Sequence, residues 1–133
     1  MGPRVLISDR MDSGVVDVLE GIKGLIVDEN TELTPKELLG VIGEYDGLIV
    51  RSSTKVTEDV IQAGKRLRVI GRAGAGVDNI DVAAATRRGI VVMNTPGGNS
   101  TSTAEYSVGL LLALARQVPQ ATMSVRAGRW ERS

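Results

Sequence analysis

The fold of this chain is decided by residues 69–79, which read Val-Ile-Gly-Arg-Ala-Gly-Ala-Gly-Val-Asp-Asn. The apolar run at 67–70 is typical of a buried strand, three glycines follow within six residues, and a helical pattern begins near Asp81. A strand that leads through a glycine-rich bend into a helix lets a ligand approach the backbone closely, and the helix N-terminus favours an anion. The sequence therefore predicts a ligand-binding turn inside an α/β fold.

Arginine stands at the end of two predicted strands. Arg72 lies within the glycine-rich stretch, and Arg51 follows the apolar run 47–50 and precedes three hydroxyl residues that begin with Ser52. The guanidinium group is a permanent cation whose planar donors suit carboxylate or phosphate. Two such groups favour a site for a small ligand with two anionic groups, and Ser52 is a candidate contact.

The pair Gly74-x-Gly76 is not by itself a dinucleotide-binding fingerprint. That pattern needs a third glycine three residues later, where Asn79 stands, and an acidic residue about twenty residues on, which is not evident. A tight turn that also lines a ligand cleft is the better interpretation. We interpret Asp78 and Asn79 as residues that begin the next helix rather than as catalytic groups.

Strands and helices alternate along the first 96 residues. Apolar runs predict strands at 4–8, 25–27, 47–50, 67–70 and 90–93. Capping patterns predict helix starts at Asp12, at Thr34 with Pro35 and Glu37, at Thr57 and at Asp81. Because the strands are apolar throughout rather than alternating, we expect a parallel sheet covered on both faces. The predicted fold class is α/β, with a flavodoxin-like, doubly wound parallel five-stranded sheet in the order 2-1-3-4-5.

In such sheets the ligand binds outside the carboxyl ends of the strands. The predicted order makes the third and fourth strands neighbours, so Arg51 and Arg72 should face the same crevice. Three other flavodoxin-like classes do not fit this edge. A receiver domain needs an aspartate where Arg51 stands, a flavin-binding flavodoxin needs a phosphate loop after the first strand, and a cobalamin-binding domain needs a histidine.

The character of the sequence changes after Pro96. A capping box, Ser102-x-x-Glu105, precedes an apolar helix expected at 104–116, and a second amphipathic segment covers 118–127. The leucines of the first helix lie on nearly all of its sides, which predicts burial against a surface that this sequence does not encode.

Composition excludes several classes of function. Lys and Arg number 16, as do Asp and Glu, and this balance disfavours nucleic acid as a partner, since a basic face would be expected. Cysteine and histidine are both absent from the 133 residues, so no thiolate site, histidine base or metal site is predicted. There is no signal-peptide pattern, and the longest apolar run, 108–115, is too short to span a bilayer. We expect a cytoplasmic chain with no membrane partner.

Several of these stretches together resemble one family. The matching motifs are Val5-Leu6-Ile7-Ser8-Asp9, Gly47-Leu48-Ile49-Val50-Arg51-Ser52-x-Thr54-Lys55-Val56-Thr57, Gly71-Arg72-Ala73-Gly74-x-Gly76-Val77-Asp78-Asn79, Met93-Asn94-Thr95-Pro96-x-Gly98-Asn99-Ser100, Leu114-Ala115-Arg116-Gln117-x-Pro119-Gln120-Ala121 and Gly128-x-Trp130-Glu131-Arg132. On these residues the chain resembles the N-terminal part of the D-isomer-specific 2-hydroxyacid dehydrogenases, most closely the animal-type members that act on 3-phosphoglycerate. The resemblance covers essentially the whole chain.

The resemblance implies an oxidoreductase that uses NAD to oxidise 3-phosphoglycerate to 3-phosphohydroxypyruvate, the first step of serine biosynthesis. It implies a substrate-binding domain at 1–96 and, at 97–133, a linker with the first helices of the NAD-binding domain. The residues implied to bind substrate are Arg51, Ser52, Arg72, Ala73, Gly74 and Gly76. Those implied to contact the cofactor are Ala75, Val77 and Asn99. Ala75 stands where animal members often have a threonine, so only a backbone contact is expected there.

The catalytic arginine, glutamate and histidine of the family, and its complete Gly-x-Gly-x-x-Gly, lie outside this sequence. We therefore expect no catalytic residue here, no turnover by the chain alone, and NAD bound mainly by an absent domain. The parent enzyme is expected to be a homo-oligomer with helices 102–127 at domain and subunit interfaces. Two alternatives stay open, namely another D-2-hydroxyacid dehydrogenase of the glycerate or hydroxypyruvate type, and a non-catalytic flavodoxin-like interaction module.

Overall fold

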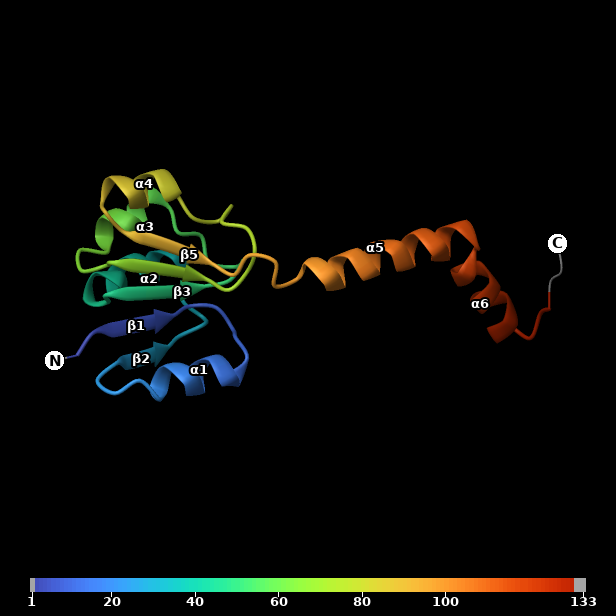
Figure 1. The fold of residues 1–133 in the computed structure, drawn as a ribbon, viewed down its shortest axis with the longest axis horizontal. Helices are drawn as coiled ribbons and strands as arrows, with labels where there is room; N and C mark the ends of the chain where they lie inside the picture. Colours follow the sequence, from blue (N-terminus) through green and yellow to red (C-terminus); the bar gives the residue numbers. More distant parts are fainter. Residues whose placement is uncertain (1, 131–133) are drawn as a thin grey trace. The chain divides into compact units, whose positions relative to one another are not determined.

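The computed structural model of this chain describes residues 2–130. The chain forms two compact units, Met1–Pro96 and Gly97–Ser133, and each is described by itself. The first unit alternates strands with helices (Figure 1). Its elements are β1 (Arg4–Ile7), α1 (Ser13–Glu20), β2 (Ile26–Glu29), α2 (Pro35–Val41), the 3-10 turn η1 (Ile42–Glu44), β3 (Gly47–Val50), α3 (Glu58–Ala63), β4 (Val69–Arg72), α4 (Val82–Arg87) and β5 (Val91–Asn94).

The five strands form one parallel sheet in the order β2-β1-β3-β4-β5, so the predicted topology is confirmed. The chain steps one way from β1 to β2 and the other way through β3, β4 and β5. Because crossovers between parallel strands are right-handed, α1 must lie on the opposite face from α2, α3 and α4. β3 and β4 are neighbours in a register that sets Val50 beside Arg72.

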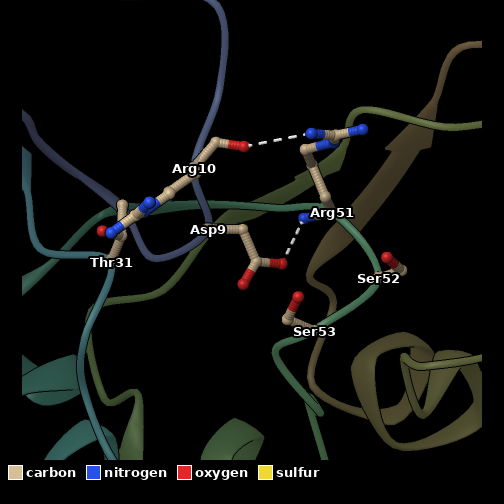
Figure 2. A pocket seen from close by; sticks show the side chains of 6 residues that line it. All are labelled: Asp9, Arg10, Thr31, Arg51, Ser52 and Ser53. Atoms are coloured by element: carbon tan, nitrogen blue, oxygen red, sulfur yellow. Dashed lines mark hydrogen bonds between the residues drawn. The ribbon is translucent and has the colours of Figure 1, made fainter.

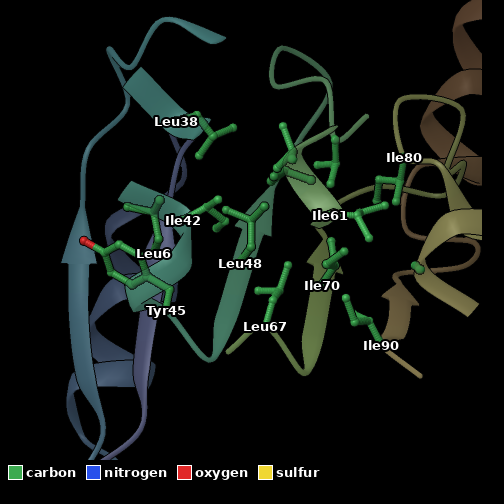
Figure 3. Packing of buried hydrophobic residues seen from close by; sticks show 14 of the residues in the cluster. Leu6, Leu38, Ile42, Tyr45, Leu48, Ile61, Leu67, Ile70, Ile80 and Ile90 are labelled. Carbon is green, nitrogen blue, oxygen red and sulfur yellow. The ribbon is translucent and has the colours of Figure 1, made fainter. Parts of the chain in front are cut away.

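The main core lies between the sheet and α2, α3 and α4 (Figure 3). Leu48 of β3 and Ile70 of β4 point towards these helices, and neither has any exposed surface. Ile42 of η1 and Ile61 of α3 belong to the same cluster and are likewise fully buried. Each such side chain contributes about 1.5–3 kcal/mol relative to an exposed one, so this face holds the sheet in place.

The other face of the sheet is less well covered than predicted. α1 has no buried residue, and Val91 and Met93 of β5 are both 58 % exposed. The apolar character of the strands was correctly identified, but in the described part of this unit α2, α3 and α4 cover one face while α1 alone packs on the other.

Most helix caps agree with the sequence. Thr34 and Glu37 form the predicted capping box, and Asp12 and Asp81 accept hydrogen bonds from the first turns of α1 and α4. Thr57 occupies the N-cap position of α3 as predicted, but its side chain makes no capping hydrogen bond. The helix start predicted at Asp78 and Asn79 is wrong, since α4 begins after Asp81.

One strand boundary matters for the site. β4 spans Val69–Arg72 rather than 67–70, because its pairing with β3 starts at Val69 opposite Gly47. Leu67 is buried in the core but lies outside the ladder. Arg72 is therefore the last residue of the strand, and its backbone is fixed by the sheet.

The second unit consists of two helices, α5 (Ser100–Ala115) and α6 (Val118–Arg126). The capping box predicted at Ser102 is wrong, because α5 begins earlier and the Ser102 hydroxyl donates to the Asn99 carbonyl at 3.1 Å. Within residues 2–130, none of the helices combines the length and the apolarity needed to cross a membrane.

Candidate functional site

The carboxyl ends of β1, β3 and β4 bring three loops to one edge of the sheet. Asp9 follows β1, Arg51 begins the loop after β3, and the glycine-rich stretch follows Arg72 at the end of β4. Ser8 donates its backbone N–H to the Ile49 carbonyl at 3.0 Å, which continues the β1–β3 ladder up to this edge. Residues far apart in the sequence are thus set side by side by strand pairing.

Asp9 organises the loop 51–54. Its side chain accepts hydrogen bonds from the backbone N–H of Arg51 at 2.6 Å, from the N–H of Thr54 at 3.1 Å, and from the Thr54 hydroxyl at 2.8 Å. Asp9 is only 5 % exposed. A buried carboxylate with three donors is a charge-assisted clamp, and it bends the chain so that residues 51–53 face outward.

Asn79 holds the same loop from the other side. Its Nδ2 donates to the carbonyls of Arg51 at 2.8 Å and of Thr54 at 2.7 Å. Asn79 is 5 % exposed, and its Oδ1 has no hydrogen-bond partner among the described residues. Asn79, which stands where a dinucleotide loop would have its third glycine, therefore has a structural role. Its side-chain amide links the loop after β4 to the loop after β3.

Arg72 is committed mainly to backbone carbonyls. Its Nη1 donates to the Gly76 carbonyl at 2.7 Å and its Nε to the Arg51 carbonyl at 3.2 Å, while Asp78 lies 3.7 Å from Nη2. The side chain is only 11 % exposed. A Cβ at Gly74 would come within 2.7 Å of Nη1, so a larger residue there would displace the Arg72 guanidinium. Arg72 thus stabilises the glycine-rich turn through the Gly76 carbonyl and the backbone of Arg51 through its carbonyl.

A pocket of about 350 Å³ opens beside Arg51. Figure 2 shows the six residues that line it, which are Asp9, Arg10, Thr31, Arg51, Ser52 and Ser53. The Arg51 side chain donates from Nη1 to the Arg10 carbonyl at 3.2 Å and is otherwise exposed. Guanidinium groups and hydroxyls in one pocket are donors suited to a small anion.

The predicted substrate contacts are distributed unevenly around this pocket. Arg51 and Ser52 line it, whereas Arg72 does not. Ala73 donates its N–H to the Val50 carbonyl at 2.9 Å, and the carbonyls of Gly74 and Gly76 accept from Thr95 N–H and from Arg72. These backbone groups lie on the adjacent β4 loop, and their contact with substrate stays a prediction.

The residues predicted to contact a cofactor are also placed by the fold. Ala75 is exposed, and its carbonyl accepts from Asn94 Nδ2 at 2.6 Å, while Val77 is half-buried. Asn99 belongs to the second unit, where it precedes α5 without a capping hydrogen bond. Across residues 2–130, no three side chains of the metal-binding acidic, His or Cys types are grouped to hold a metal ion.

Sequence reasoning missed four residues of this edge. Asp9, Thr54 and Asn79 belong to the motifs that match the family but were assigned no contact with one another, Asn79 was also interpreted as a helix start, and Arg10 was given no role. The one available signal was that Asp9 directly follows the carboxyl end of an apolar strand, where ligands of such sheets bind.

A comparison with known families decides the relationship. Residues 5–128 match the profile of the D-isomer specific 2-hydroxyacid dehydrogenase catalytic domain. The chain belongs to the D-isomer specific 2-hydroxyacid dehydrogenase family. The predicted family resemblance is thereby confirmed.

Individual members of the family agree with this assignment. The chain is 56 % identical to the D-3-phosphoglycerate dehydrogenase of Sus scrofa over 97 % of its own length and 24 % of that protein. It is similar to the PH0520 protein of Pyrococcus horikoshii, with a TM-score of 0.81 and 39 % identity over 99 % of this chain and 39 % of that one. It is also similar to the NAD+-bound 3-phosphoglycerate dehydrogenase of Entamoeba histolytica, with a TM-score of 0.70 and 32 % identity over 85 % and 39 % of the two chains. The chain thus spans about a quarter of the length of the curated family members it matches.

Proposed function

We propose that this chain is the substrate-binding part of an NAD-dependent dehydrogenase that oxidises 3-phosphoglycerate to 3-phosphohydroxypyruvate, the first step of serine biosynthesis. The observation that carries the proposal is the pocket lined by Arg51, Ser52 and Ser53. The names of the similar proteins from pig and Entamoeba support the choice of a phosphorylated 2-hydroxyacid.

Within this proposal the pocket binds and orients the substrate. Arg51 offers a fixed cation, because its backbone N–H is held by Asp9 and its carbonyl by Asn79. The hydroxyls of Ser52 and Ser53 add neutral donors beside it. Holding the anionic groups in one orientation presents the hydroxyl-bearing carbon to the acceptor of its hydride.

The residues of this chain do not fit a complete NAD site. Asn79 occupies the place of the third glycine of a dinucleotide loop and is buried by its bonds to loop 51–54. We propose that NAD, which would supply the hydride acceptor, is held mainly by residues outside this sequence. Only backbone contacts from Ala75 and Val77, and a contact from Asn99, are proposed here.

We propose that the 133-residue chain has no dehydrogenase activity by itself. It contains no histidine, the commonest general base for removing the hydroxyl proton, and it lacks a self-sufficient dinucleotide loop. A turnover assay with 3-phosphoglycerate and NAD should stay at the background rate. A rate above background that purifies with the chain would contradict this proposal.

The helices of the second unit are proposed to pair with a second copy of the chain. Tyr106, Leu111 and Leu114 of α5 are 70 %, 67 % and 76 % exposed, and a helix that is apolar on all sides is normally buried. Sedimentation measured over a range of concentrations should show a dimer, and a purely monomeric chain would contradict the proposal.

The substrate proposal is tested by a thermal-shift titration with 3-phosphoglycerate. A ligand that binds only the native state raises the melting temperature as its concentration exceeds the dissociation constant. We expect the shift to occur in the wild type and to be lost in Arg51→Ala, whose exposed side chain makes one hydrogen bond. Absence of a shift in the wild type, or equal shifts in both proteins, would contradict the proposal.

A further inference from the structure

Arg10 lines the same pocket as Arg51, although the sequence gives it no evident role. We propose that Arg10 and Arg51 together hold the phosphate group of the substrate, so that Arg10 determines the preference for a phosphorylated over an unphosphorylated 2-hydroxyacid. This inference rests on the function proposed above.

The charges that line the pocket support a role for Arg10. Asp9 contributes one negative charge to the lining, and Arg10 and Arg51 contribute one positive charge each. Arg10 is the residue that makes the lining positive overall. A phosphate monoester carries a charge of about −1.5 to −2 at pH 7, so two guanidinium groups match it better than one.

Arg10 is also available to a ligand. Its guanidinium is 85 % exposed, and its recorded carboxylate partner, Glu32, lies 3.9 Å away and is 84 % exposed. That distance exceeds a hydrogen bond, and exposed pairs of this kind contribute little. Arg72 differs, since turning its guanidinium outward would break its 2.7 Å bond to the Gly76 carbonyl.

The backbone under Arg10 is nevertheless fixed. Its carbonyl accepts from Arg51 Nη1 (Figure 2), and the preceding residue is the buried Asp9, which accepts from three donors. The two arginines lie on either side of Asp9 in this view. A flexible cation on a fixed backbone can close over a bound anion without any movement of the sheet.

The strand order indicates which end of the substrate meets Arg10. Arg10 follows β1 and Thr31 follows β2, so both lie on the far side of Arg51 from β4. The proposed cofactor contacts, Ala75 and Val77, follow β4. The reacting carbon should therefore face β4, and the phosphate at the other end should face Arg10.

The test compares three single substitutions in the 133-residue chain by calorimetric titration with 3-phosphoglycerate and with D-glycerate. We expect Arg10→Gln to weaken 3-phosphoglycerate binding about five- to tenfold, as for the loss of one ion contact in an exposed pocket. Arg10→Lys should restore part of the affinity. The matched control is Arg68→Gln, which removes the same group from another exposed residue. Arg68 directly precedes β4 and so lies at the amino-terminal ends of the strands, opposite the pocket. This variant should bind 3-phosphoglycerate with unchanged affinity.

D-Glycerate separates a phosphate contact from a general charge effect. Its affinity should be the same in the wild type and in Arg10→Gln, or binding should be absent in both. An affinity for 3-phosphoglycerate that differs less than about twofold between the wild type and Arg10→Gln would overturn the inference, as would an equal loss for both ligands. A wild type that binds neither ligand would overturn the proposed function itself. Because Arg10 is exposed, an unchanged unfolding curve for the variant is expected and excludes a folding defect.

Discussion

Arginines lie at both ends of the parallel strands, but their partners differ. We call the amino-terminal ends of the strands the amino edge and the carboxyl-terminal ends the carboxyl edge. At the amino edge, Arg4 lies 2.7 Å from Asp28 and 3.1 Å from Glu44, and its guanidinium stacks 4.9 Å from the centre of the Tyr45 ring. Arg66 pairs with Asp46 at 2.9 Å. The positive charges of Arg4 and Arg66 are thus paired with carboxylates within the protein.

At the carboxyl edge the arginine donors go chiefly to carbonyls. Arg51 donates to the Arg10 carbonyl, and Arg72 donates to those of Arg51 and Gly76. Within the part of the chain that the structure describes, Arg51 has no carboxylate within ion-pair distance. A carbonyl fixes the direction of a guanidinium but does not cancel its charge. The positive charge of Arg51 is therefore available to an anion, whereas the charges of Arg4 and Arg66 are paired with carboxylates.

The largest expected effect comes from Asp9→Ala, which removes the anchor of the carboxyl edge. The N–H groups of Arg51 and Thr54 and the Thr54 hydroxyl would lose their acceptor in a buried place. We expect the free energy of unfolding to fall by about 3 kcal/mol, together with loss of 3-phosphoglycerate binding. Urea denaturation measures the first effect, and an unchanged midpoint would show that the clamp does not stabilise the fold.

Asn79→Ala should have the next largest effect. Two carbonyls lose a donor, although that of Arg51 keeps Arg72 Nε. We expect a loss of about 2 kcal/mol. Asn94→Ala is the matched control, because Asn94 makes the same kind of bond to the Ala75 carbonyl but is exposed, and it should cost less than about 0.5 kcal/mol. Equal losses in the two variants would contradict the assigned role of Asn79.

At the amino edge, Asp46→Asn should cost about 1 kcal/mol at neutral pH and leave ligand binding intact. The hydrogen bond from the Arg4 N–H and the Arg66 side chain hold the pKa of Asp46 below its usual value. A carboxyl whose folded pKa is lowered stabilises the protein above its unfolded pKa, and this contribution is lost as the pH falls below about 4. The stability of the variant, measured between pH 7 and 3, should therefore decline less than that of the wild type. A parallel decline would contradict the assignment.

The smallest effect is expected for Arg66→Gln. Its side chain is 53 % exposed, so loss of its ion pair should change the unfolding free energy by about 0.5 kcal/mol or less. The Arg66→Gln variant should bind 3-phosphoglycerate with the affinity of the wild type. The Arg51→Gln variant, in contrast, should bind it several-fold more weakly. Weaker binding by Arg66→Gln would show that net charge, rather than the carboxyl edge, attracts the ligand.

The fold could be predicted because its signals are local. Short apolar runs separated by capped helices gave the five strands, and apolar strands gave the parallel topology. The predicted boundary of β4 was wrong because a non-local pairing sets it. β4 is shifted by two residues because Val69 pairs with Gly47, and no property of residues 67–72 alone reveals that partner.

The site was predicted only in part for the same reason. Arg51 could be identified because it directly follows a strand. The roles of Asp9 and Asn79 depend on bonds that span 42 and 28 positions to Arg51. Their residue types, an acid after a strand and an amide in a turn, are common and have ordinary local explanations.

The double anchoring of loop 51–54 has a consequence for the kinetics of folding. Its N–H groups are bound by a residue following β1 and its carbonyls by one following β4, so the loop acquires its shape only when three strands have met. Contacts of such long sequence separation form late, since chain closure must precede them. The pocket should therefore reach its native geometry only after the sheet has formed during refolding. Recovery of ligand binding after dilution from urea should lag behind the recovery of helical circular dichroism.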